Sequence, residues 1–162
     1  MGKVLSSFGP GFAGAIARSI DDVVIAMPNT GDSPLAFGVP VVLDEDKIGV
    51  QLFGSDNTAA DFIGVTVRNP SKTPTTYGSN EGSYAGGEMV DILVRGHIVV
   101  KVVSATPAPN LGDAVAIMKS NGKFSFQGSG ETTKVPLTNA RFTSVPDSNG
   151  MAEIVLDKRN VL

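Results

Sequence analysis

The sequence contains no cysteine, which excludes disulfide bridges, thiol nucleophiles and thiolate metal sites. It also contains no tryptophan and only two tyrosines, so it has few of the aromatic side chains on which sugar-binding platforms depend. A single histidine, His97, is the only imidazole available for acid–base catalysis or metal binding. Stability must therefore come from packing or assembly, and any catalytic site has few residues to draw on.

Charge is scarce and its balance is slightly acidic. Charged residues make up 18% of the chain, the formal net charge is −3, and the lysines and arginines are scattered singly. No positive field attracts phosphate backbones, so we expect no nucleic-acid partner. We find no run of about 18 apolar residues and no basic, then apolar, leader pattern. We therefore expect neither a membrane span nor a signal peptide, and place the newly made chain in the cytoplasm.

Glycine and proline are abundant, with 19 and 10 copies, which is typical of many short elements joined by turns. Residues 1–37 carry them at short intervals and show no sustained hydrophobic period apart from residues 23–26. This pattern predicts an N-terminal arm and connection, with at most one short strand or helical turn near residues 13–20. Residues 38–162 are predicted to form a β domain.

Within residues 38–162 the hydrophobic period is two, as expected for strands. Residues 39–43 and 48–53 flank a charged turn, and residues 115–118 and 123–126 flank Asn121-Gly122, which favours a type I′ hairpin. Along residues 89–103 apolar side chains alternate with polar ones, and Gly96 marks a bend or bulge that would divide a long strand. The predicted fold is all-β, a compact antiparallel sandwich or barrel with an extended N-terminal arm.

Gly9, Gly11 and Gly14 stand at the spacing G-x-G-x-x-G, which dinucleotide-binding turns use. Such a turn needs a buried strand before the first glycine and an amphipathic helix after the third. Here Pro10 lies inside the turn and no alternation of strand and helix follows. The glycines instead favour an arm that bends closely over another surface.

No catalytic or metal-binding pattern stands out. His97 lies between Arg95 and Lys101 on one strand face, and no neighbouring side chain is predicted to orient it. The carboxylates at 44–46 are typical of a solvated hairpin tip and lack the spacing of a calcium loop. We expect no catalytic residue, cofactor or metal. Tyr77 and Tyr84 are candidates for a glycan site, with the alternative that each ring pins its loop to the sheet.

The apolar side chains of the arm need a covering surface, because exposed apolar groups on an arm favour aggregation. The sequence predicts that a partner protein supplies this surface. The predicted partner-binding residues are Phe8, Pro10, Gly11, Phe12, Gly14, Ile16 and Ile20.

The segment Pro-Gly-Phe-Ala-Gly-Ala-Ile-Ala at residues 10–17 resembles the N-terminal arm of tailed-phage structural cement, or capsid decoration, proteins. Residues 89–96, the Gly-x-x-Val turn at 112–115 and the closing stretch 149–154 fit the same family. The resemblance implies a non-enzymatic protein on the outer surface of the capsid that stabilises contacts between major capsid protein subunits of HK97-like fold. It also implies assembly as a dimer or trimer.

Two other classes of function remain open. One is a virion or cell-surface adhesion module that binds glycans through its loops. The other is a small β-fold hydrolase such as a nucleotide pyrophosphatase, although the chain shows none of the glycine-tyrosine-aspartate or arginine-serine motifs of that site.

Overall fold

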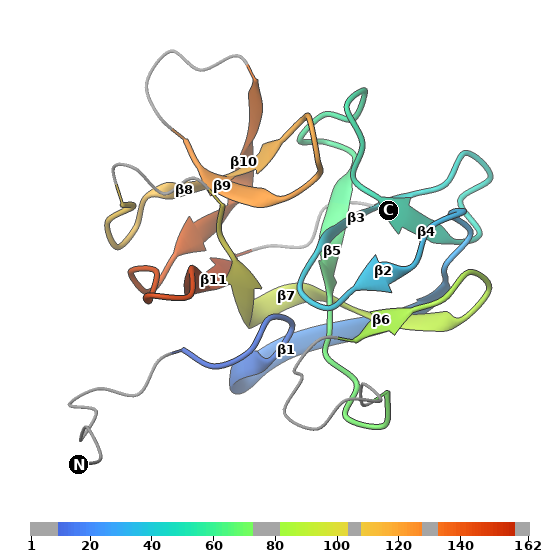
Figure 1. Cartoon of the computed structure of the whole chain (residues 1–162), viewed down its shortest axis with the longest axis horizontal. Coiled ribbons are helices and arrows are strands. Elements are labelled where there is room, and N and C mark those ends of the chain that lie inside the picture. The colour runs from blue at the N-terminus through green and yellow to red at the C-terminus, as the bar shows by residue number, and fades with distance from the viewer. Residues whose placement is uncertain (1–9, 73–81, 104–107, 128–132, 158–162) are drawn as a thin grey trace.

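The computed structural model describes residues 10–72, 82–103, 108–127 and 133–157, and every regular element within these ranges is a β-strand (Figure 1). The predicted all-β class is confirmed. The strands are β1 (Ile16–Pro28), β2 (Leu35–Ala36), β3 (Pro40–Leu43), β4 (Val50–Leu52), β5 (Phe62–Thr66), β6 (Ser83–Tyr84), β7 (Met89–Lys101), β8 (Ala114–Met118), β9 (Phe124–Phe126), β10 (Lys134–Phe142) and β11 (Met151–Leu156).

The long strand β7 organises the sheet. In its first half Leu93 lies between Val24 of β1 and Val65 of β5. In its second half β11 replaces β5, and Ile98 lies opposite Ile154. Thus β1 follows one edge of β7, while β5 and β11 share the other edge.

The sheet curls into an antiparallel half-barrel with the strand order β4-β3-β5-β7-β11-β10-β8-β9, and β1 pairs with β7 beside this path. A bridge from Val102 to Phe124 brings β9 back to the end of β7, and a bridge from Asn29 to Val50 joins the end of β1 to β4. β2 and β6 form a separate two-stranded sheet. Of the two predicted architectures, the barrel describes this curled sheet better than the sandwich.

Two apolar clusters fill the molecule. The larger core surrounds Phe62, Phe124, Phe142 and Ile154, and the smaller core surrounds Leu35, Val41, Tyr84 and Ile92. All eight side chains are almost completely removed from water. Burial of apolar area at about 25 cal/mol per Å² is the main favourable term in folding, so these two cores hold the curled sheet together.

The even-numbered side chains of β7 change from the smaller core to the larger one at Gly96. Val94 packs in the smaller core, whereas Ile98, which has the same parity along the strand, packs in the larger. Gly96 has φ +121°, and a Cβ there would overlap the carboxylate of Asp22. Gly96 does not divide the strand as the sequence suggested, because β7 runs unbroken and the register irregularity lies in β1 opposite it.

The segment predicted as arm and connection contains a strand longer than expected, since β1 has 13 residues. Three register shifts interrupt its pairing with β7. Because of these irregularities, the sequence of β1 does not show a sustained period of two. The hairpins predicted around residues 44–47 and around Asn121-Gly122 are confirmed. The prediction of a type I′ turn is wrong. That turn needs a positive φ at both central residues, and Gly122 has one whereas Asn121 does not.

Candidate functional site

The described part of the predicted binding segment is fixed to the subunit through its backbone. The Gly14 N–H donates to the carbonyl of Val99 at 2.7 Å, and the Val99 N–H donates to the carbonyl of Ala15 at 2.9 Å. The Gly14 carbonyl accepts a hydrogen bond from the Arg68 N–H at 2.8 Å. Residues 14–15 therefore extend the pairing of β1 alongside the end of β7.

Gly14 packs against a second glycine, Gly38. Both have positive φ, +78° and +70°. A Cβ on Gly14 would lie 2.8 Å from the Arg68 nitrogen, and a Cβ on Gly38 would lie 2.6 Å from the Gly14 nitrogen. The close approach of two backbones explains this glycine, and the chain continues from it into a strand. A dinucleotide turn would require a helix there.

Two apolar side chains of the same segment point outward. Phe12 is 47% exposed and Ile16 is 38% exposed. The Arg68 guanidinium lies over the Phe12 ring, 4.9 Å from its centroid, which limits where the ring can lie. The backbone is thus fixed while these side chains remain accessible.

The remaining predicted binding residues fall into different environments. Gly14 is buried, Pro10 is half-buried and Gly11 is exposed with φ +111°. Ile20 lies in β1, and its side chain is outside the described set, as is the whole of Phe8. Their contact with a partner stays a prediction.

A groove of about 990 Å³ opens beside this segment. Its described lining combines apolar side chains with two lysines and an asparagine: Phe12, Phe37, Val103, Phe124, Met151, Lys101, Lys123 and Asn149. These residues come from segments far apart in the sequence, brought together by the curl of the sheet. Sequence reasoning missed the groove, because no local pattern links its walls.

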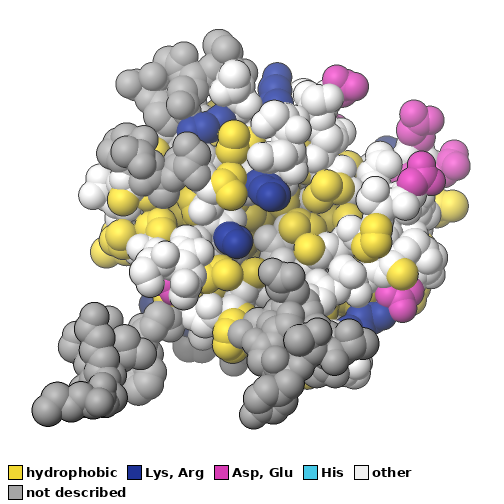
Figure 2. Space-filling view, viewed as in Figure 1, with side chains coloured by type: hydrophobic (Ala, Val, Ile, Leu, Met, Phe, Trp, Pro, Cys, Tyr) yellow, Lys and Arg dark blue, Asp and Glu magenta, His cyan; other side chains and the backbone are white. Residues whose placement is uncertain are grey.

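The groove is locally positive. No aspartate or glutamate is among its described lining residues, although the whole chain carries a net charge of −3. Figure 2 shows apolar side chains with lysines or arginines between them across the middle of the molecule, while acidic side chains lie toward its rim. The described side chains of Lys101 and Lys123 form no ion pair within the subunit.

His97 belongs to a polar cluster that joins three strands. Its Nδ1 lies 3.0 Å from Glu153 Oε1, and the same oxygen lies 2.9 Å from Arg18 Nε. The Thr143 hydroxyl donates to that oxygen at 3.0 Å. The expectation that nothing orients His97 is wrong, since Glu153 does. The cluster ties β1, β7 and β11 together, and the Thr143 hydroxyl is already committed to the carboxylate.

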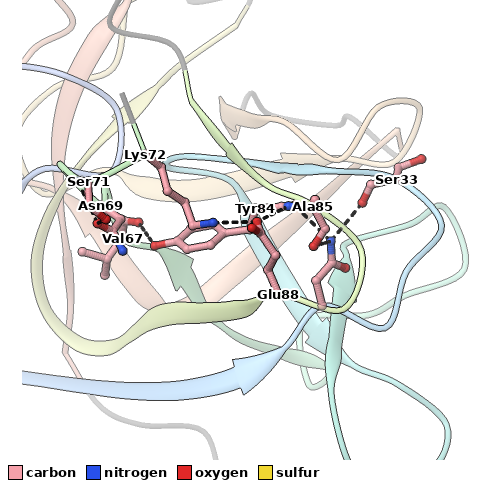
Figure 3. A network of polar contacts seen from close by, with 9 residues as sticks. Ser33, Val67, Asn69, Ser71, Lys72, Tyr84, Ala85 and Glu88 are labelled. Carbon is pink, nitrogen blue, oxygen red and sulfur yellow. Dashed lines mark hydrogen bonds and ion pairs between the residues drawn. The ribbon is translucent and has the colours of Figure 1, made fainter. Parts of the chain in front are cut away.

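Tyr84 is buried beneath the loop that carries it (Figure 3). Its hydroxyl donates to the Val67 carbonyl at 2.7 Å, and its ring meets Phe37 edge-on at 5.5 Å. Burial and the charge of nearby Asp91 raise the pKa of Tyr84 to about 12. This ring pins its loop and cannot stack on a sugar, whereas Tyr77, the other candidate for a glycan site, lies outside the described residues.

Asn29 supports the same region through its side-chain amide. Its amide nitrogen donates to the carbonyls of Ser33, Tyr84 and Ala85 at 3.1, 3.2 and 3.3 Å. Its amide oxygen accepts from the Gly31 N–H at 3.0 Å. One buried side chain thus satisfies four backbone groups from two loops.

Among the described residues no group of three or more His, Asp or Glu side chains is placed to hold a metal ion. Asp44 accepts from the Ile48 N–H at 2.9 Å, which is how a turn is closed. The described part of the chain also has no helix long and apolar enough to cross a membrane.

Comparison with known proteins decides the family. The family model described as "Structural cement protein (E217 gp24/Pam3 gp6)" matches residues 3–157. The chain belongs to this phage structural cement protein family. The fold is also similar to a chain in a solved structure titled "The capsid of Myoviridae Phage XM1", with a TM-score of 0.76 and 18% identity over 96% of each chain. No curated protein matches the chain.

Membership of this family makes the protein a structural component of the phage capsid and not an enzyme. The His97 cluster is accordingly a strand-to-strand contact of the cement protein. The resemblance found in the sequence at residues 10–17 and 89–96 is confirmed at the level of the family. The fixed segment with outward Phe12 and Ile16, and the groove beside it, are accessible apolar surfaces of the cement protein.

Proposed function

We propose that this cement protein binds the outer surface of the phage head and stabilises contacts between major capsid protein subunits of HK97-like fold. Phe12 and Ile16 contact the capsid, with the neighbouring residues of the segment shaping that surface. Before assembly the protein resides in the host cytoplasm.

The observation that carries this proposal is the combination of a fixed backbone with exposed apolar side chains. Gly14 is hydrogen-bonded to Val99 and Arg68, so the segment is ordered without a partner. Phe12 and Ile16 nevertheless remain 47% and 38% exposed. A surface that is ordered in advance binds with a smaller entropic cost, because fewer side chains and backbone angles must be immobilised on contact.

We further propose that the protein acts as a dimer or trimer. A capsid offers many copies of each binding site, so an oligomer gains from multivalency even when each contact is weak. This makes a modest apolar contact at Phe12 and Ile16 sufficient for stable decoration.

The experiment is co-sedimentation of purified protein with expanded heads that lack it. The double variant Phe12→Ala/Ile16→Ala should lose head binding while keeping its melting temperature, since neither side chain is buried. Leu111→Ala/Val145→Ala is the matched control, because these residues are also large, apolar and exposed, at 67% and 54%. It should bind heads like the wild type.

Point variants are a cleaner test than deletion of residues 1–20, since β1 begins at Ile16 and the deletion would remove part of the sheet. Undiminished head binding by the Phe12/Ile16 variant would move the contact elsewhere on the surface. Failure of the wild-type protein to bind heads at all would overturn the proposal.

A further inference from the structure

The groove contains two cations without a described counterion. Lys101 and Lys123 are both exposed and lie among apolar side chains such as Phe37, Phe124 and Met151. The volume of about 990 Å³ is at the upper end of the range, about 300 to 1,000 Å³, in which binding pockets fall. The groove therefore suits a short segment that carries acidic side chains beside an apolar one.

The chain presents such a segment at the turn between β3 and β4. Asp44, Glu45 and Asp46 follow one another there, and Ile48 is 66% exposed. Lys47 adopts φ +57°, which tightens the turn and lets it project. Glu45 and Asp46 are exposed, and no described side chain pairs with either of them.

The turn cannot fill the groove of its own subunit. Pro40, the first residue of β3, lines the groove, whereas the turn begins beyond Leu43 at the far end of that strand. Four extended residues span about 13 Å, so the turn points away from the groove. A second copy of the chain is needed to bring the two surfaces together.

We propose that the acidic turn at residues 44–48 of one copy docks in the groove of a second copy. Ile48 then covers the apolar lining, and Glu45 and Asp46 lie against Lys101 and Lys123. Two copies related by a twofold axis can form this contact twice, which closes the assembly. The inference rests on the proposed self-association and names its surface.

The test is sedimentation equilibrium of the wild type and of charge-reversed variants. Glu45→Lys/Asp46→Lys and Lys101→Glu/Lys123→Glu should each raise the dissociation constant of self-association by about a hundredfold, because like charges across an interface cost several kcal/mol. An equimolar mixture of the two variants should recover association, since the reversed turn fits the reversed groove. Ile48→Ala should weaken association without changing the charge.

Matched controls separate this contact from a general effect of charge. Asp32→Lys/Asp56→Lys makes the same change in net charge as the turn variant at other exposed positions. Lys119→Glu makes half the charge change of the groove variant, in the same turn as Lys123. Both controls should associate like the wild type. At concentrations where the wild type is monomeric, all variants should keep the wild-type melting temperature, because association itself stabilises the folded state.

The outcomes distinguish the two proposals. Monomeric wild type at every concentration would overturn both self-association and this contact. Oligomers that tolerate both charge reversals would overturn the contact alone. If the groove variant stayed oligomeric but lost head binding, the capsid protein and not a second copy would occupy the groove.

Discussion

Residues of the same type are used in opposite ways by two regions of this protein. The anchoring region contains Gly14, Asn29, Tyr84 and Lys72, each held by bonds or close packing inside the subunit. The groove region contains Gly11, Asn149, Lys101 and Lys123, which line an open surface. A side chain already satisfied within the subunit stabilises the fold, whereas one without a partner there is available for assembly.

Substitution of one glycine in each region should give the largest difference in the free energy of unfolding. Gly14→Ala should lower the free energy of unfolding by about 3 to 4 kcal/mol, because the new Cβ meets two backbone nitrogens at a positive φ. Gly11→Ala shares the positive φ but has no atom within 4 Å of the new Cβ. Gly11→Ala should therefore lower the free energy of unfolding by only about 1 kcal/mol. Denaturant unfolding checks both, and equal losses would contradict the close packing of Gly14 on Gly38.

Substitution of one asparagine in each region should give the next largest difference in the free energy of unfolding. Asn29→Ala leaves three carbonyls and one N–H without their partner, so we expect a loss of about 2 to 3 kcal/mol in the free energy of unfolding. Asn149→Ala, at the exposed groove, should change it by no more than about 0.5 kcal/mol. Thermal unfolding of both variants gives the comparison, which would fail if Asn149 proved as costly to remove.

Tyr84 makes the anchoring region sensitive to high pH. Its folded pKa of about 12 lies above the 10.0 of an ordinary tyrosine, so its contribution to stability is complete below pH 10 and is lost as pH rises toward 12. Tyr84→Phe should remove that part of the decline and should cost about 1 kcal/mol at neutral pH through the lost bond to Val67. Unfolding curves at several alkaline pH values check it, and an unchanged decline in the variant would assign the effect to other groups.

The lysines should give the smallest difference in stability. Lys72 pairs with Glu88 at 2.6 Å and lies 5.4 Å from the centre of the Tyr84 ring, so Lys72→Ala should lower the melting temperature slightly. Lys101→Ala/Lys123→Ala should leave it unchanged.

The Lys72 variant and the groove double variant should also differ in how their stability declines at acid pH. Hydrogen bonds from Lys72 and from the Ala85 N–H hold the pKa of Glu88 below the 4.5 of an ordinary glutamate. Its stabilising contribution is therefore present above that value and is lost as pH falls through the lowered pKa. Lys72→Ala should flatten this acid-side decline, and the groove double variant should not. A parallel shift in both variants would show that general charge, and not this pair, governs the acid side.

Local patterns predicted much of the fold. The alternation along residues 89–103, the charged turn after residue 43 and the Asn-Gly at 121–122 each express a preference of neighbouring residues, and each marks an observed strand or hairpin. The full length of β1 was not predicted, because the irregularities in its pairing with β7 break the period of two. Phe12 and Ile16 are exposed in the candidate site, and their contact with a partner stays a prediction.

What the sequence by itself determined was the all-β class, the absence of thiol chemistry and the family resemblance, since composition and short-range period carry this information. Only the tertiary structure decided that Gly14 meets Gly38, that Glu153 orients His97, and that Lys101 and Lys123 share a groove with no acidic residue among its described lining. These contacts join residues up to 56 positions apart. They depend on how the sheet curls around β7, which no local pattern specifies.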